Sequence, residues 1–292
     1  MEYGAIFKGS EKGAVFPHEL TEPCRVLENV ELTQPPKSTS EYVISVDLAT
    51  SQAKDADNAA ICVLKLIERE DGTYLTRLVQ IRTFHGRGLD KLAEEVRRLL
   101  VSFPNTIKVV FDHRGLGDAF PLFLSEPWID PVTRKEYPPL VVDTEHSTIR
   151  NAVPLLRPVV ADNKLNQQLV TVTTVNLEQR KIELPVSSRK LVEDRLIEED
   201  DEGRTIKSRT LTKEEKAIFL EADALQVELG QIVAKETVAG NVIYDTAKYN
   251  QHKDRYSALS MGLRYISELE NKRIQKIRNG EVDDVGIVGT WN

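Results

Sequence analysis

The chain has 292 residues, of which 40% are hydrophobic and 29% charged, and its formal net charge is -7 at pH 7. These proportions exclude collagen-like, low-complexity and disulfide-framework proteins, and the two cysteines fit a reducing compartment. No apolar run approaches the roughly 18 residues of a membrane span, and the N-terminus has no basic stretch followed by an apolar one. We therefore expect neither a membrane protein nor a secreted one. The net acidity also argues against coating of DNA through bulk charge.

The first half of the chain predicts an arm followed by three strands. Prolines interrupt residues 1–40, which we expect to form a loosely built arm before the main domain. The β-branched apolar run YVISVDL (42–48) predicts a buried strand. Two further runs, 59–69 and 74–84, are separated by the turn sequence EDGT, so they predict a hairpin.

A helix and a fourth strand follow the hairpin. Leucine and valine recur at helical spacing over 89–103, and IKVVFD (107–112) predicts another buried strand. A helical crossover returns the fourth strand parallel to one already in the sheet. If that neighbour is the first strand, Asp47 and Asp112 lie side by side at the edge where open α/β sheets build their sites.

The second half of the chain is less regular. It predicts, in order, a strand at 140–143, a helix at 163–177, an extended segment at 181–185, a protruding hairpin at 194–211, a helix at 212–230 and a helix at 254–270. Thr212 and Glu215 form a capping box for the first of the two last helices. We expect the main domain to span 41–270, with a C-terminal tail at 271–292.

The last helix carries a third aspartate. Ala258, Gly262 and Tyr265 mark its inward stripe, and Asp254 precedes Ala258 by four residues, so its carboxylate continues the stripe toward the sheet. Helix N-terminal N–H groups favour the ionised form of such a carboxylate. The ordinary alternative is a simple helix cap.

Three carboxylates gathered in one place point to cations. Singly, Asp47 and Asp112 are explained as turn residues and Asp254 as a cap. Together they are costly to bring close without positive charge. Clustered carboxylates bind Mg²⁺ or Mn²⁺. Two such ions roughly 3.5–4 Å apart can activate water and stabilise the leaving oxygen in phosphodiester hydrolysis.

Four segments, in this order, resemble one family: VISVDLAT (43–50), VVFDHRGLGDAF (109–120), GNVIYDT (240–246) and HKDRYSALSMGLRYI (252–266). They resemble the C-terminal nuclease domain of the large terminase subunit of tailed bacteriophages. The resemblance covers residues 40–270. It implies an α/β, RNase H-like fold of the RuvC type: a mixed sheet of five or more strands, flanked by helices, with an inserted β-hairpin at about 194–211.

The resemblance also assigns roles to residues. Asp47 becomes the central ligand of two Mg²⁺ or Mn²⁺ ions, with Asp112 the second and Asp254 the third. The family usually has another acidic residue directly before the third ligand, where this chain has Lys253. Because of this replacement, the sequence leaves open whether a second metal ion binds.

Three auxiliary candidates accompany this set. His252 can act as an outer ligand or proton carrier, or it is simply an exposed histidine before a helix. Asp57 and Asp118 are further acidic candidates, although Asp118 also suits the cap of the short helix after Gly117.

DNA contact must come from local charge, because the net charge is negative. The candidate contacts are His113, Arg114, Arg180, Lys181, Arg204, Lys207 and Arg209, with Arg189 and Lys190 as a further basic pair. By the resemblance, the hairpin at 194–211 bears on DNA; alternatively it is a solvated hairpin whose acidic residues at 198–202 balance its bases. No base-reading motif or zinc site is present, so we expect cleavage of duplex DNA without sequence preference.

The expected function is metal-dependent endonuclease activity on concatemeric double-stranded DNA. The sequence lacks the phosphate-binding G-x-x-x-x-G-K-[ST] loop of a packaging ATPase, so we interpret it as the nuclease portion, with 1–40 as an interdomain remnant. The implied partners are the packaging ATPase domain, the small terminase subunit and the portal. The resemblance places a monomeric domain in the host cytoplasm, transiently at the procapsid portal.

Other functions stay open. One is a docking module for the packaging motor and portal with little intrinsic activity, which Lys253 and the net acidity favour. Another is a structure-selective, RuvC-like resolvase, which would be dimeric. An actin-like ATPase also opens with a strand ending in Asp, but the sequence offers no second phosphate-binding hairpin.

Overall fold

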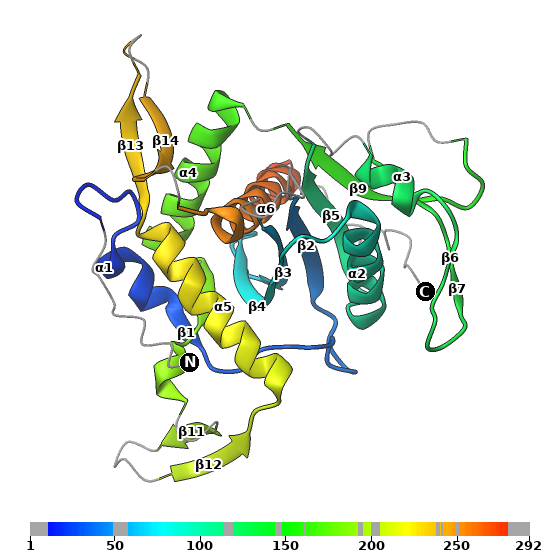
Figure 1. The fold of residues 1–292 in the computed structure, drawn as a ribbon, viewed down its shortest axis with the longest axis horizontal. Helices are drawn as coiled ribbons and strands as arrows, with labels where there is room; N and C mark the ends of the chain where they lie inside the picture. Colours follow the sequence, from blue (N-terminus) through cyan, green and yellow to red (C-terminus); the bar gives the residue numbers. More distant parts are fainter. Residues whose placement is uncertain are drawn as a thin grey trace.

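The protein folds around one central sheet. The computed structural model describes residues 11–48, 58–113, 119–143, 148–160, 162–191, 195–199, 205–237, 240, 242–248 and 251–279. The sheet has eight strands in the order β1-β10-β4-β3-β2-β5-β9-β8 (Figure 1). The predicted fold class, an α/β mixed sheet flanked by helices with an inserted hairpin, is confirmed.

The directions of the strands determine which strand ends lie at the same edge of the sheet. β2 (Glu41–Asp47), β3 (Ala59–Glu68) and β4 (Tyr74–Phe84) form an antiparallel meander. Beside β2, the parallel strands are β5 (Thr106–Asp112), β9 (Val153–Val159) and β8 (Leu140–Val142). Beside β4, they are β10 (Ile182–Pro185) and β1 (Arg25–Leu27). Every strand of this sheet except β3 therefore runs the same way, so their carboxyl ends share one edge.

Helices cover both faces of the sheet (Figure 1). On one face lie α2 (Leu89–Ser102) and α3 (Phe120–Leu124), packed on Val46 and Phe111. On the other lie α4 (Asn163–Glu178), α5 (Lys213–Leu229) and α6 (Asp254–Arg278), packed on Val43 and Val110. Because side chains alternate along a strand, neighbouring residues of β2 and β5 serve the two cores in turn.

Helix α6 approaches β2 and β3 closely at Gly262. A Cβ atom there would stand 2.5 Å from Leu64 Cδ1 and 3.1 Å from Ser45 Cβ. Ser45 therefore faces α6, and so does every second residue of β2. No helix of the described segments is long and apolar enough to span a bilayer.

Most predicted elements are confirmed within a residue or two, but several parts of the fold differ from the predictions. Helix α6 continues to Arg278, beyond the predicted end at 270. Strand β9 has no counterpart in the predictions, because Pro154 and Pro158 lie within it and proline argues against a strand. The sequence also did not predict the hairpin of β13 (Ile232–Glu236) and β14 (Val242–Thr246), nor the short pair β6 (Trp128–Ile129) and β7 (Glu136–Tyr137).

Residues 11–40, predicted as a loosely built arm, pack on the rest of the molecule. They include α1 (His18–Thr21), a 3₁₀ turn (Glu22–Cys24) and the edge strand β1. Phe16 is fully buried, with its ring 5.5 Å from that of Tyr256 between centroids. The N–H of Val15 donates to the carbonyl of Ile232 at 2.8 Å. The segment thus lies against the start of α6 and the β13–β14 hairpin.

Two hairpins lie at opposite ends of α5 (Figure 1). β11 (Arg195–Glu199) and β12 (Thr205–Thr210) pair before the helix, as the sequence predicts, and β13 and β14 pair after it. At about 1.5 Å per residue, the 17 residues of α5 separate the two hairpins by about 25 Å.

Candidate active site

Asp47 and Asp112 lie opposite each other at the carboxyl edge of the sheet. The parallel register pairs Val46 of β2 with Phe111 of β5, and each aspartate is the next and last residue of its strand. Because side chains alternate along a strand, Asp47 and Asp112 point to the same face of the sheet as Ser45 and Val110. That face is covered by α6. The predicted juxtaposition of these two strand ends is confirmed.

Asp254 reaches the same edge from the helix layer. It is the first residue of α6 and is only 6% exposed. Its Oδ2 accepts the backbone N–H of Asn58, just before β3, at 3.1 Å. β3 starts at this edge because it runs against its neighbours, so the hydrogen bond ties the helix N-terminus to the sheet beside Asp47.

The charges of Asp112 and Asp254 oppose the ionisation of Asp47. Burial, and then the charges of Asp254 and Asp112, raise the pKa of Asp47 well above its usual value, while a hydrogen bond from Ser257 acts in the opposite direction. The three predicted aspartates thus lie near enough to interact electrostatically. A bound cation would relieve this repulsion, which is how clustered carboxylates come to hold metals.

A buried carboxylate of α5 holds the first turn of α6. Glu228 accepts the backbone N–H of Tyr256 at 3.0 Å and Nη1 of Arg255 at 2.6 Å. Nε of Arg255 donates to Glu221 at 2.6 Å. Burial raises the pKa of Glu228, although Arg255 opposes the shift. Sequence reasoning missed this support; the only signal was the spacing of Glu221 and Glu228, seven residues apart on one helix face.

The two residues before Asp254 differ in their contacts. His252 Nδ1 lies 3.8 Å from Asp254 Oδ2, and the imidazole is 45% exposed. Nζ of Lys253 donates to Asp245 Oδ1 of β14 at 2.6 Å. Lys253 therefore connects the start of α6 to the β13–β14 hairpin.

Of the remaining predicted residues, the structure describes the contacts of His113 and Lys181. His113 packs its ring 6.2 Å from that of Phe111, which belongs to the core beneath α2 on the opposite face. Lys181 donates to Glu270 at 2.6 Å, far along α6 from Asp254, and Arg180 is its neighbour. Asp57, Asp118, Arg114 and Arg204 lie outside the described residues, and the side chains of Lys207 and Arg209, on β12, are likewise not described.

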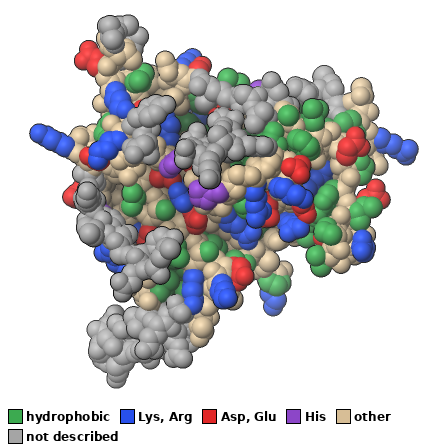
Figure 2. Space-filling model, in the orientation of Figure 1, with side chains coloured by type: hydrophobic (Ala, Val, Ile, Leu, Met, Phe, Trp, Pro, Cys, Tyr) green, Lys and Arg blue, Asp and Glu red, His purple; other side chains and the backbone are tan. Residues whose placement is uncertain are grey.

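Two exposed basic residues that the sequence analysis did not select lie at the same edge of the sheet as the aspartates. β4 is parallel to β2 and ends there at Phe84, and the exposed His85 and Arg87 follow it. Arg87 bonds Glu95 at 3.1 Å and lies over the ring of Phe84 at 4.8 Å from its centroid. In Figure 2, histidine atoms near the middle of the visible face are flanked by a group of Lys and Arg side chains, with acidic ones among them.

The oxygen atoms at this site are of the type that binds a hard divalent cation. Asp47, Asp112 and Asp254 offer carboxylate oxygens, and the buried Oδ1 of Asn58 has no hydrogen-bond partner within the described part of the chain. Oxygen ligands of this type suit Mg²⁺ and Mn²⁺. As they stand, no three His, Cys, Asp or Glu side chains of the described ranges are close enough to hold an ion. A bound ion would have to draw the carboxylates closer.

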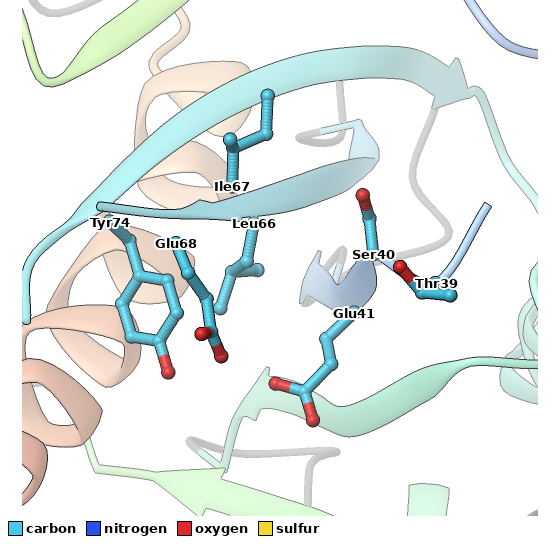
Figure 3. Close-up of a pocket in the computed structure, with 7 residues that line it drawn as sticks. All are labelled: Thr39, Ser40, Glu41, Leu66, Ile67, Glu68 and Tyr74. Carbon is cyan, nitrogen blue, oxygen red and sulfur yellow. The ribbon is translucent and has the colours of Figure 1, made fainter. Parts of the chain in front are cut away.

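A well-defined hollow of about 390 Å³ lies elsewhere (Figure 3). Glu41, Glu68 and Tyr74 are among the residues that line it, at the start of β2, the end of β3 and the start of β4. It therefore opens at the edge opposite the aspartates, one full length of β2 away, and takes no part in the carboxylate site.

Comparison with known proteins identifies the fold. No protein-family model matches the sequence, and no curated protein sequence matches it. Among solved structures, the large terminase nuclease from thermophilic phage G20c with bound magnesium superposes with a TM-score of 0.51 at 14% identity, covering 87% of this chain and 97% of that chain. The same nuclease with bound cobalt gives the same TM-score, identity and coverage. The chain therefore has the fold of a phage large terminase nuclease, as its motifs predict.

Proposed function

We propose that the protein is a metal-dependent DNA endonuclease of a phage packaging terminase, which cuts concatemeric double-stranded DNA. The observation that carries this proposal is the facing pair Asp47 and Asp112, at the ends of adjacent parallel strands, with Asp254 near enough to raise the pKa of Asp47. The shared fold with a nuclease crystallised with magnesium and with cobalt supports it.

The three aspartates would hold one or two Mg²⁺ or Mn²⁺ ions. When bound, such ions lower the pKa of an attacking water and stabilise the leaving oxygen of a phosphodiester. Asp47 and Asp112 would bind the ion from the sheet, and Asp254 would bind it from α6, where the N–H of Asn58 orients its carboxylate. Direct attack by water needs no covalent enzyme intermediate.

We assign to His252 the transfer of a proton at this site. Its Nδ1 is 3.8 Å from Asp254 Oδ2, and its exposure lets it exchange protons with solvent. A neutral imidazole has one nitrogen that accepts a proton and one that donates a proton. It can therefore take a proton from the water that is attacking and pass it to bulk solvent.

DNA would approach along the carboxyl edge. His85 and Arg87, exposed beyond β4, are the described basic residues that we assign to phosphate contact. Arg87 pairs with Glu95, but its side chain stays 47% exposed, whereas the side chain of Lys181, which pairs with Glu270, is 12% exposed. By the resemblance, the packaging ATPase domain, the small terminase subunit and the portal are the partners, and the host cytoplasm is where the domain acts.

The test is plasmid nicking and linearisation with Mn²⁺, Mg²⁺ or EDTA, comparing wild type with Asp112→Asn. Asp143→Asn is a matched control, because Asp143 bonds Lys108 and Arg157 away from the aspartates. We expect metal-dependent cutting that Asp112→Asn abolishes and the control retains. No cutting by folded wild-type protein with either metal would contradict the proposal and favour the docking module. Dimers that prefer four-way junctions would favour the resolvase.

A further inference from the structure

We propose that Asn58 supplies a neutral oxygen ligand to the cation held by Asp47, Asp112 and Asp254. The proposal rests on the proposed function and adds to it a ligand that is not acidic. It assigns the contact to the side-chain amide oxygen, Oδ1, and leaves to the backbone N–H of Asn58 its observed bond to Asp254.

The register of the sheet puts Asn58 on the correct face. Asp47 pairs with Ala60 across the antiparallel β2–β3 ladder, so both side chains are on one face of the sheet. Ala60 belongs to the core beneath α6. Asn58 comes two residues before Ala60, so its side chain emerges on that same face, at the edge where Asp47 and Asp112 end their strands.

Within the described residues, the side-chain oxygen of Asn58 accepts no hydrogen bond. The residue is 6% exposed. A buried amide oxygen left without a hydrogen-bond partner is unfavourable, because folding has removed it from water. The backbone N–H of the same residue donates to Asp254 Oδ2 at 3.1 Å, so Asn58 lies beside the carboxylate of Asp254.

A neutral oxygen suits this particular cluster. Three carboxylates already share this edge, two at the ends of adjacent parallel strands and one at the start of α6, so a fourth would add to their mutual repulsion in the metal-free protein. An amide oxygen adds a coordination position without adding charge. Hard cations such as Mg²⁺ and Mn²⁺ accept amide oxygens together with carboxylates.

A second buried amide gives a matched control. Gln80 of β4 is 1% exposed, and its Oε1 and Nε2 also have no partner among the described residues. Gln80 pairs with Val63, whose side chain belongs to the core beneath α2. Its amide is therefore buried in the same sheet but faces away from the aspartates.

The test measures Mn²⁺ binding by calorimetry in the absence of DNA. The proteins are the full chain, Asn58→Leu, which removes the oxygen at nearly constant volume, Asn58→Asp, which keeps an oxygen and adds charge, and the control Gln80→Leu. We expect Asn58→Leu to weaken binding about tenfold to a hundredfold, Asn58→Asp to tighten it, and Gln80→Leu to bind as wild type does. Circular dichroism checks that each variant is folded.

Each contrary outcome has a distinct meaning. Wild-type affinity in folded Asn58→Leu, even with slower cutting, would overturn the assignment and leave Asn58 a positioning residue for Asp254. If Asn58→Leu does not fold, unchanged affinity in Asn58→Asp overturns the assignment instead. If Asp112→Asn also binds Mn²⁺ as wild type does, the proposed metal site itself fails. Loss of binding in Asp112→Asn with wild-type binding in Asn58→Leu rejects the Asn58 assignment alone.

Discussion

Glu228, near the end of α5, accepts the backbone N–H of Tyr256, in the first turn of α6, at 3.0 Å. Lys253, at the N-cap of α6, makes no side-chain capping hydrogen bond. The cap therefore comes from another helix, and it fixes the turn that carries Asp254.

We predict that Glu228→Ala lowers the free energy of unfolding by about 2 kcal/mol, because a buried cap and a charged partner of Arg255 are lost. It should also raise the Mn²⁺ concentration needed for half-maximal cutting. Glu228→Gln keeps an acceptor for Tyr256 and should stay nearer to wild type in both respects. Denaturant unfolding and metal titrations of plasmid cutting measure the two effects. An unchanged metal requirement in folded Glu228→Ala would show that the cap does not position Asp254.

Asp47 should make the metal-free protein less stable at neutral pH. Its pKa is raised in the folded state, so the folded protein holds this proton more tightly than the unfolded chain does. The resulting stabilisation is present below the unfolded pKa of about 3.9 and is lost as pH rises through the folded pKa. In EDTA at pH 7.5, Asp47→Asn should therefore melt at a higher temperature than wild type, with a smaller difference at pH 4.

Added Mn²⁺ should reverse that order. It should raise the melting temperature of wild type, and more so at higher pH, because protons and the cation compete for the same oxygens. Asp47→Asn should not respond. Thermal unfolding across pH 4–8, with and without Mn²⁺, provides both comparisons. A metal-free Asp47→Asn protein that melts below wild type at pH 7.5 would argue against carboxylate repulsion.

Lys253→Asp should lower the metal concentration that cutting requires, by at least severalfold, because it restores an acidic residue before Asp254. The Lys253–Asp245 pair is partly exposed on both sides, so its loss should cost no more than about 1 kcal/mol. Lys253→Ala, which loses the pair without adding a carboxylate, serves as the control. Equal metal requirements in the Asp and Ala variants would count against a second metal position here.

Arg87→Glu should weaken DNA binding and reduce the slope of log affinity against log salt by about one, as the loss of one phosphate contact does. Lys190→Glu makes the same charge change on an exposed residue of the predicted Arg189–Lys190 cluster, after β10. We expect it to bind as wild type does. Affinity for a short duplex, measured at several salt concentrations, distinguishes them. A larger effect of Lys190→Glu would move the DNA path away from the β4 edge.

The helices and strands that depend on a local sequence pattern were predicted well. Apolar runs gave β2 to β5, helical spacing gave α2, and the Thr212 capping box gave the start of α5. The crossover rule limited the fourth strand to a parallel position, and Asp47 and Asp112 were expected to face each other if that position was beside the first strand, as the register shows it is.

The parts that the sequence could not give depend on long-range contacts. Glu228 meets Tyr256 and Asn58 meets Asp254 only after α5, α6 and β3 are brought together, and no local pattern records these pairs. Basic residues were selected by clustering along the chain, which favoured Lys181 over Arg87. In the fold, Lys181 is engaged with Glu270, whereas Arg87 reaches the carboxyl edge because β4 is parallel to β2.

The most direct measurement is anomalous diffraction at the manganese absorption edge from crystals of the protein soaked in Mn²⁺. The proposed function predicts one or two anomalous peaks between the carboxylates of Asp47, Asp112 and Asp254, absent from crystals of Asp112→Asn. Full manganese occupancy elsewhere, with no peak at these aspartates, would contradict it.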